Sequence, residues 1–310
     1  TATEKIINLY NDGSSINTVN IGGDTSNPKV KLNSTQGIML DNNGDYRYYG
    51  ADPNNYVKFN NELWRIIGVF RNVDDGTGTK EIRLKIIRDE SIGSYSYDSS
   101  LNTINSGQGI NDWSKSDLMT ELNTLYYNSK SGTCYNGQNN ASTTCNFTST
   151  GLESTAKSMI DDAVYYLGSI YSITGLYADD YYNYERGTSV YDCNINDGAC
   201  PRATVWQGKV GLIYSSDYAY ATDLNLCSEE GILYSNTNCK NNNWLFSESI
   251  QWNITSYFHT GYHTFIIDEN SSIGTGRVFN PYAVKPVVYL KSDITITEGS
   301  GTSSDPYILR

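Results

Sequence analysis

The chain has 310 residues, of which 38% are hydrophobic and 18% charged, and its formal net charge is −12. This length is sufficient to bury a substantial core in one large domain or two smaller ones. Because the acidic residues are spread along the chain, we expect neither a nucleic acid nor an anionic lipid surface as a partner, since both require clustered Lys and Arg. No stretch is long and apolar enough to span a bilayer, so we expect no direct membrane insertion.

Tyrosine is the unusual component, with 27 residues against 7 phenylalanines. A tyrosine presents an apolar ring and a hydrogen-bonding tip, which suits a wet, half-buried surface better than an oily core. Together with abundant Asn, Ser, Thr and Gly, this composition is typical of secreted recognition surfaces.

The six cysteines form three local couples: Cys134 with Cys145, Cys193 with Cys200, and Cys227 with Cys239. Each couple encloses a short polar loop, and loop closure favours pairing between near neighbours. The alternative, a zinc site, is less favoured because the chain has no CxxC pair and only two histidines. The spacing therefore predicts three disulfides and an extracellular or cell-surface location.

Residues 1–45 form a polar N-terminal segment, with a strand-like piece at 30–32 and a possible first helical turn at 4–7. Alternating residues at 45–49 and 56–59 predict strands. The apolar run 62–70, the Asp- and Gly-rich turn 74–78 and the alternating run 81–88 predict a β-hairpin with one buried face.

Two central helices are expected next. The first follows Trp113 and Ser114 and carries Leu118, Met119, Leu122 and Leu125. The second begins at a capping box of Thr150 and Glu153 and carries an apolar stripe. That stripe comprises Leu152, Ala156, Met159, Ile160, Ala163, Val164 and Leu167.

Short late strands are expected at 208–214, 244–247, 263–267, 284–290 and 294–297. Residues 170–205 are expected to form an irregular surface excursion. An early hairpin, two central helices and late strands predict an α+β fold. We divide the chain into the N-terminal segment 1–45, a domain at 46–298 with irregular insertions, and a C-terminal tail at 299–310.

Several long motifs resemble a family of uncharacterised surface proteins of Gram-positive gut bacteria. They are Tyr-Arg-Tyr-Tyr-Gly-Ala-Asp-Pro-Asn-Asn-Tyr-Val at 46–57, Glu-Leu-Trp-Arg-Ile-Ile-Gly-Val-Phe at 62–70, Asn-Asp-Trp at 111–113, the stretch 131–140, Tyr-Glu-Arg-Gly-Thr at 184–188, Trp-Gln-Gly-Lys-Val-Gly-Leu at 206–212, 216–222, and Val-Lys-Pro-Val-Val-Tyr-Leu at 284–290. The resemblance covers nearly the whole chain and implies a surface location without specifying an activity.

The order of these motifs is also similar to the C-type-lectin-like architecture, in the branch that contains formylglycine-generating enzyme. That resemblance implies a strand at 62–70 paired with one at 284–291. The chain lacks the Glu-Pro-Asn or Gln-Pro-Asp loop of calcium-dependent lectins, and Trp252-Asn253 is followed by Ile254. It also leaves no cysteine pair free for the copper of the oxidase branch, so we expect no cofactor.

Candidate ligand-binding residues lie where that fold places ligands and in the tyrosine-rich excursion. The first group is Trp252, Asn253, Tyr257, His259 and Tyr262, and the second is Tyr181, Tyr182 and Tyr184. For each residue the alternative is an aromatic or polar side chain packed beneath a loop.

Three patterns suggest chemistry, and each has a simpler interpretation. His259 and His263 have the spacing of a helical metal pair, but Thr260-Gly261-Tyr262 is poor helix, so we expect a loop pair without a metal. Residues 41–45 alternate oxygen ligands as a calcium loop does, but without the usual glycine and glutamate, which favours an ordinary turn. The acidic couples Asp161-Asp162 and Asp179-Asp180 could serve glycoside hydrolysis, although solvated carboxylates are the default.

The sequence thus predicts a non-catalytic extracellular binding or adhesion module for a glycan or protein ligand. One alternative is a structural subunit of a surface filament or layer that binds copies of itself through residues 1–45. A third possibility is a carbohydrate-active enzyme. The ligand's identity, the oligomeric state, the mode of anchoring and calcium binding are not specified by the sequence.

Overall fold

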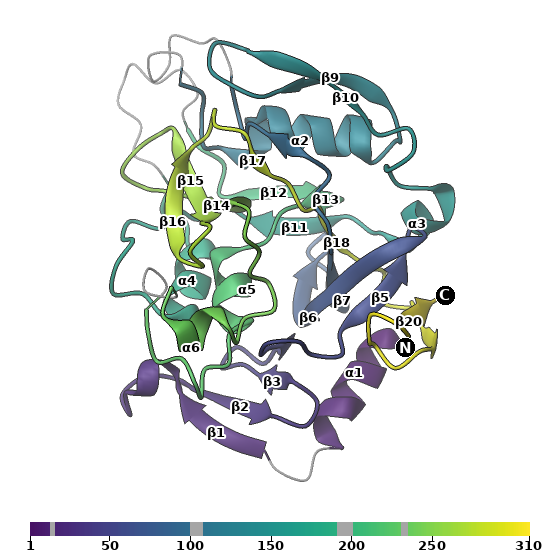
Figure 1. The fold of residues 1–310 in the computed structure, drawn as a ribbon, viewed down its shortest axis with the longest axis vertical. Coiled ribbons are helices and arrows are strands. Elements are labelled where there is room, and N and C mark those ends of the chain that lie inside the picture. The colour runs from purple at the N-terminus through teal and green to yellow at the C-terminus, as the bar shows by residue number, and fades with distance from the viewer. Residues whose placement is uncertain (13–15, 100–107, 191–200, 231–234) are drawn as a thin grey trace.

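A long β-hairpin, β6 (Glu62–Asp74) and β7 (Lys80–Arg88), runs through the centre of the computed structural model (Figure 1). The model describes residues 1–12, 16–99, 108–190, 201–230 and 235–310. The predicted hairpin is confirmed, with antiparallel pairing from Trp64 opposite Arg88 to Asp74 opposite Lys80. Every residue from Trp64 to Phe70 is buried, so the middle of β6 is covered on both faces and not on one as expected.

The hairpin belongs to a branched eleven-stranded sheet. One edge of β6 pairs with both β4 and β5, and its other edge with β7, which in turn pairs with β18. A side chain at Gly68 would place its Cβ 2.3 Å from the Tyr46 carbonyl oxygen, so glycine allows β4 to lie against β6. The other strands of this sheet are β1 (Ile16–Asn20), β2 (Lys29–Asn33), β3 (Ile38–Leu40), β4 (Tyr46–Tyr48), β5 (Tyr56–Phe59), β13 (Val210–Gly211), β18 (Val287–Tyr289), β19 (Ile296–Glu298) and β20 (Tyr307–Leu309).

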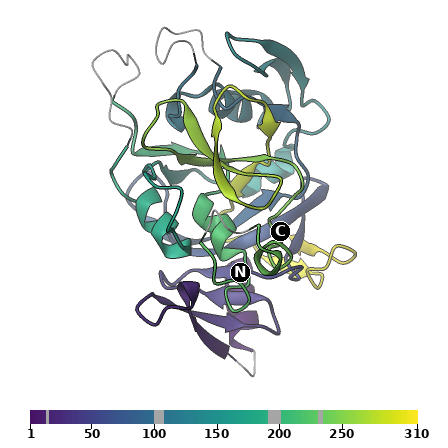
Figure 2. The same cartoon turned by 60° about the vertical axis from the view of Figure 1, so that its left-hand side comes forward.

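A second sheet of five strands lies beside the first, seen face-on in Figure 2. Its strands are β8 (Ser94–Tyr95), β14 (Gln251–Ser256), β15 (His263–Ile267), β16 (Ile273–Arg277) and β17 (Tyr282–Ala283). Two further antiparallel pairs are β9 (Ser131–Tyr135) with β10 (Ser142–Asn146), and β11 (Ala163–Tyr166) with β12 (Val205–Gly208). The fold is mixed and consists mostly of strands, which agrees with the α+β class at this coarse level.

The helices are short. They are α1 (Ala2–Asn11), α2 (Asp117–Glu121), α3 (Ser154–Met159), α4 (Ala178–Glu185), α5 (Ser215–Tyr220) and α6 (Thr237–Lys240), with the 3-10 turns η1 (Ile21–Gly23) and η3 (Trp113–Lys115) and the π-helical η4 (Leu122–Tyr126). The expected first central helix is confirmed as α2 continued by η4. Its start is fixed by Ser116, whose hydroxyl accepts a hydrogen bond from the Met119 amide.

Further sequence-based expectations differ from the structure. The second central helix runs only from Ser154 to Met159, and the expected capping box of Thr150 and Glu153 is not formed, since Glu153 is the N-cap without a side-chain capping bond. Residues 163–166 form β11 against β12, and the aromatic and β-branched run Val164-Tyr165-Tyr166 suits a strand. Residues 244–247 form turns instead of a strand, and the excursion 170–205 contains helix α4. The late strand β18 pairs with β7, so residues 62–70 do not pair directly with residues 284–291.

The N-terminal segment 1–45 folds onto its own chain. Strands β1, β2 and β3 extend the main sheet from β4, and the Ala2 amide donates to the Ile294 carbonyl at 2.7 Å. Helix α1 begins at a capping box of Thr1 and Glu4, and Asn33 binds the carbonyl of Tyr10 at 2.7 Å. Figure 1 shows the N-terminus beside the C-terminal strand β20. The segment is therefore part of the folded domain.

Two of the three predicted disulfides are confirmed. Cys134–Cys145 joins β9 to β10, and Cys227–Cys239 joins Cys227 to helix α6. The third couple, Cys193 and Cys200, lies outside the described residues. Such bonds are compatible with an oxidising, extracellular compartment. Within the described ranges, no helix is long and apolar enough to cross a membrane.

Helix α2 carries a buried acid that holds the β9–β10 hairpin. Glu121 is 4% exposed, and its Oε1 accepts a hydrogen bond from the Tyr135 amide at 2.9 Å. No hydrogen-bond partner for its Oε2 is found among the described residues. Burial raises the pKa of Glu121 to about 8. The folded protein therefore retains a proton on Glu121 that the unfolded chain releases near its ordinary pKa of 4.5.

The stability that this proton provides is complete below pH 4.5 and is lost as the pH rises to about 8. We expect Glu121→Gln to remove this loss, because the amide keeps the shape without a charge. Between pH 4.5 and pH 8, the free energy of unfolding of the wild type should fall more steeply with pH than that of the variant, by about 1 kcal/mol per pH unit. Thermal unfolding at pH 5 and pH 8 measures the difference, with the exposed Glu90→Gln as the control. Parallel pH dependence in wild type and Glu121→Gln would contradict the assignment.

Candidate functional site

Five buried charged side chains meet where strands β4 and β7 of the main sheet contact helix α5, and we call them the buried charge cluster: Asp41, Asp45, Arg47, Lys85 and Asp217. Arg47 Nε lies 2.6 Å from Asp41 Oδ2, and its Nη1 lies 3.0 Å from Asp217 Oδ1. Its Nη2 is 3.8 Å from Asp45 Oδ2. Lys85 Nζ is in direct contact with Asp217 Oδ2. One arginine thus joins the turn before β4 to helix α5, while Lys85 joins α5 to β7.

Aromatic rings replace water around the two cations. The Arg47 guanidinium carbon lies 4.6 Å from the ring centre of Tyr220 and 4.7 Å from that of Phe70. Lys85 Nζ lies 4.4 Å from the centre of Tyr214. Cations attract the faces of such rings, and the attraction grows where water is excluded.

The acidic turn 41–45 is built around the side chain of Asp41. Its Oδ1 accepts hydrogen bonds from the amides of Asn43 and Asp45, at 2.8 and 2.9 Å, and its Oδ2 binds Arg47. These contacts occupy both oxygens of the first residue of the suggested calcium loop, in the manner of an ordinary polar turn. Among the described residues, no group of three or more His, Cys, Asp or Glu is arranged to hold a metal ion.

Burial and mutual charge set the pKa values in the cluster. Burial, helped by the neighbouring Asp41, raises the pKa of Asp45 to about 6. Burial lowers the pKa of Lys85 to about 8, although Asp217 opposes this effect. Burial also acts to raise the pKa of Asp217, but Lys85 and Arg47 outweigh it and hold that pKa below its ordinary value.

A cavity of about 300 Å³ opens next to the cluster, and we call it the tyrosine pocket. It draws side chains from β6, β7, β11, α4 and β18 and from the turns before β4 and α5. Its lining comprises Asp45, Phe70, Asn72, Val73, Lys80, Val164, Tyr166, Tyr182, Arg186, Tyr214 and Tyr289.

Arg186 is the central cation of the tyrosine pocket. Its guanidinium carbon lies 3.7 Å from the ring centre of Tyr182 and 4.8 Å from that of Tyr214. Its Nη1 donates to Glu185 Oε2 at 3.0 Å, and no other hydrogen bond from this guanidinium is found among the described residues. Glu185 is itself bound by the Ser216 amide and the Thr255 hydroxyl, at 3.0 Å each. Arg186 is therefore held in place from behind, with donors available to a ligand in the pocket.

The candidate residues at 252–262 differ in their exposure to solvent. Trp252 and Asn253 are fully buried in β14, where Trp252 Nε1 donates to the Tyr95 carbonyl and Asn253 Nδ2 to the Ser215 hydroxyl. Tyr257 and Tyr262 are half-buried, and His259 is exposed in a turn with its ring 5.5 Å from that of Tyr257. Trp252 and Asn253 are therefore packed in the interior, which was the alternative to ligand binding in the sequence analysis.

The second candidate group lies on helix α4. Tyr181 is fully buried, Tyr184 is half-buried with its hydroxyl 2.5 Å from that of Tyr171, and Tyr182 lines the tyrosine pocket. Tyr182 is therefore the one member of the eight that lies in this cavity.

The histidine and acidic pairs make local contacts. His263 lies in β15, and its Nδ1 is 2.7 Å from the Thr260 hydroxyl. Asp161 lies 3.4 Å from Arg83, and Asp162 lies 3.2 Å from Lys209. Asp179 and Asp180 occupy the first turn of α4, where acidic residues favour the helix.

The sequence reasoning missed most of the pocket, including Arg186, Tyr214, Tyr289 and Asp45. A signal for the underlying cluster was present, because Arg47 lies between two tyrosines in β4 and Lys85 lies between Leu84 and Ile86 in β7. A charge at such a position must be paired within the fold. The identity of its partner, 132 residues away for Lys85, could not be read from the sequence.

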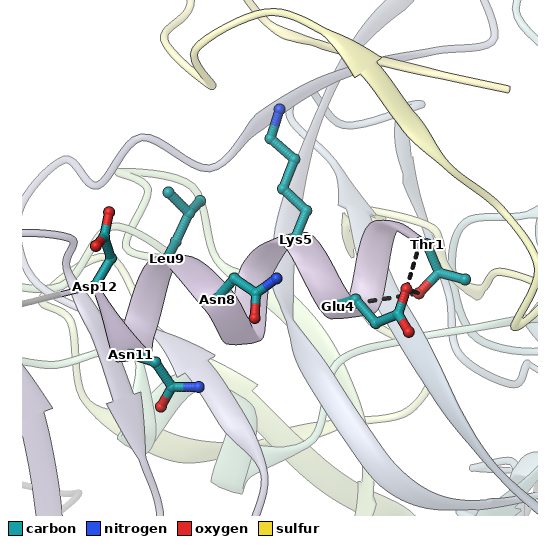
Figure 3. Close-up of a pocket in the computed structure, with 7 residues that line it drawn as sticks. All are labelled: Thr1, Glu4, Lys5, Asn8, Leu9, Asn11 and Asp12. Atoms are coloured by element: carbon teal, nitrogen blue, oxygen red, sulfur yellow. Dashed lines mark hydrogen bonds and ion pairs between the residues drawn. The ribbon is translucent and has the colours of Figure 1, made fainter.

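A larger hollow of about 570 Å³ follows the exposed side of α1. All seven residues that line it belong to this helix or its ends. Figure 3 shows their side chains spreading apart, with only the Thr1–Glu4 capping contact between them. Because no polar groups converge there, we assign no site to this surface.

In comparisons with known proteins, no family model, curated protein or solved structure matches this chain.

The charge cluster makes a direct stability prediction. Replacing Arg47 by Met would leave Asp41 buried without its cation, which typically costs about 3–5 kcal/mol. We expect urea unfolding of Arg47→Met to show a loss of this size. The control is Arg71→Met, at an exposed position nearby, where a change within about 0.5 kcal/mol is expected. Equal losses in the two variants would rule out a central role for Arg47.

Proposed function

We propose that this protein is a secreted or surface-displayed, non-catalytic binding module that holds an acidic sugar unit of a glycan in the tyrosine pocket. We further propose that its core is C-type-lectin-like. The joining of the early hairpin by the late strand β18, and the adjacent chain ends, support that fold.

The observation that carries the proposal is the combination of tyrosine rings with an anchored guanidinium. Tyr166, Tyr182, Tyr214 and Tyr289 supply flat apolar faces and hydroxyls in one cavity. Sugar rings present apolar C–H faces that pack on such rings and hydroxyls that hydrogen-bond beside them. Tyrosine also supplies this contact area at a low cost in conformational entropy.

Charge favours an acidic sugar. Arg186 and Lys80 face the cavity, against the single carboxyl of Asp45. This local excess of positive charge occurs in a chain whose net charge is −12. A guanidinium with unused donors binds a carboxylate through two parallel hydrogen bonds. We therefore place the carboxylate of the sugar against Arg186 and its hydroxyls toward Asp45 and Asn72.

The absence of catalysis is part of the proposal. Glycoside hydrolysis commonly requires two carboxyl groups on opposite sides of the scissile bond. Of the described residues that line the pocket, Asp45 alone is acidic. Glu185 lies behind Arg186 and is committed to Ser216 and Thr255.

The alternative of a filament subunit receives no support from the N-terminal segment. That alternative needs residues 1–45 to reach a neighbouring molecule. Here, strands β1–β3 are paired in order with β4 of the same chain, and the start of α1 is bonded to Ile294. We therefore favour a binding module with this segment packed in cis.

Binding to immobilised acidic glycans should depend on the pocket. We expect Tyr182→Ala to weaken the affinity about tenfold or more, because it removes the ring that lies on Arg186. Arg186→Lys should weaken it similarly, because it keeps the charge but loses the fork that matches a carboxylate. Titration calorimetry with the best glycan from an array measures both effects.

The matched control is Tyr127→Ala, a half-buried tyrosine outside the pocket. It should leave the affinity unchanged. Each variant is first compared with wild type by thermal unfolding, so that loss of fold is distinguished from loss of binding. Folded Tyr182→Ala and Arg186→Lys proteins that bind as tightly as wild type would disprove the assignment of the pocket.

A further inference from the structure

Lys85 and Asp217 form an unusual pair in the buried charge cluster. Lys85 lies in the middle of β7, and Asp217 lies in α5, 132 residues later. Both side chains are 0% exposed, and the amine nitrogen is in direct contact with a carboxylate oxygen. An amine and a carboxyl group are thus held together where solvent has no access.

The surroundings of this pair are aromatic. Lys85 Nζ lies 4.4 Å from the ring centre of Tyr214 and 5.3 Å from the centres of Phe70 and Tyr289. Water normally stabilises separated charges, and here it is replaced by ring faces. Burial among these rings disfavours the ammonium and lowers the pKa of Lys85 to about 8, which brings the neutral, nucleophilic amine within reach near neutral pH.

The two oxygens of Asp217 are held by further donors. Arg47 Nη1 donates to Oδ1 at 3.0 Å, and the Tyr214 amide donates to Oδ2 at 3.0 Å. Arg47 favours the ionised carboxylate at rest. It is also placed to stabilise the negative charge that develops on Oδ1 when a nucleophile adds to the carboxyl carbon.

We propose that Lys85 and Asp217 become joined by an intramolecular amide bond after the chain has folded. The ammonium of Lys85 first transfers one proton to Asp217 Oδ2 through their existing contact. The amine nitrogen then adds to Cγ, while Arg47 stabilises the charge on Oδ1. Oδ2 leaves as water with a second proton from the nitrogen. The ammonium and the carboxylate thus yield one amide and one water, with no oxidant, reductant or other reagent.

Folding supplies the proximity of the two reacting groups that this reaction lacks in solution. Holding the two groups in contact converts an encounter between distant residues into a reaction within one site. The reaction also removes one positive and one negative charge from the interior, so the net charge of the cluster is unchanged. Arg47 keeps its contacts with Asp41 and with the carbonyl oxygen that remains on residue 217.

The mass of the full chain tests the proposal directly. The purified protein is denatured, its cysteines are reduced and alkylated, and its intact mass is measured. We expect most molecules to be lighter than the sequence requires by about 18 Da, the mass of one water. Proteolysis should then give one branched peptide containing Lys85 and Asp217. A chain of full mass without this peptide would show that the contact is an ion pair only, and would overturn the proposal.

Two variants make the chemistry specific. Lys85→Arg keeps the positive charge but offers no amine, so it should have its full mass and migrate more slowly than wild type in a denaturing gel. Asp217→Asn should instead lose ammonia, about 17 Da, and reach the same final mass as cross-linked wild type. If Lys85→Arg retained the mass deficit, the bond would involve another residue and the assignment would be wrong. The wild-type mass decides the question even if neither variant folds.

Discussion

The contact of Arg47 with its carboxylates connects separate parts of this molecule. Asp41 comes from the turn before β4 and Asp217 from α5, and both oxygens that they present to Arg47 are buried. Removing such charges from water is costly, and the cost is offset only where each charge has close partners of opposite sign. Tyr220 and Phe70 complete the enclosure with ring faces. The arrangement therefore tolerates few relative positions of β4, α5 and the hairpin, which makes it a determinant of specificity as well as of stability.

The tyrosine pocket takes its shape from this constraint. Tyr214 lies between the two systems, with Lys85 4.4 Å and Arg186 4.8 Å from its ring centre. Its hydroxyl also accepts a hydrogen bond from the Tyr166 amide at 2.7 Å. Because Tyr214 is held by these contacts, it loses little conformational freedom when a ligand enters the pocket. Such preorganisation increases affinity without additional contacts. The interior charges and the proposed binding surface are thus parts of one rigid unit.

Sequence patterns predicted correctly those elements whose structure depends on residues that are close together in the chain. Alternation predicted the central hairpin, cysteine spacing predicted Cys134–Cys145 and Cys227–Cys239, and the periodicity after Trp113 predicted α2. The pattern at 152–167 predicted one helix, but pairing of β11 with β12, some forty residues apart, overrode it. The pocket was largely missed for the same reason. Its residues come from six or more distant segments, and only the fold brings Tyr182, Tyr214 and Tyr289 together.

The two disulfides of the described residues link positions that are close in the sequence. The two that the structure describes have sequence separations of 11 and 12, and each fastens a surface element to its own neighbourhood. Reducing agents would therefore loosen the β9–β10 hairpin and free α6 from Cys227 while leaving the central sheet intact. A covalent link between β7 and α5 would behave differently, because an amide does not respond to thiols. The periphery of this protein would then be sensitive to redox conditions, and its interior would not.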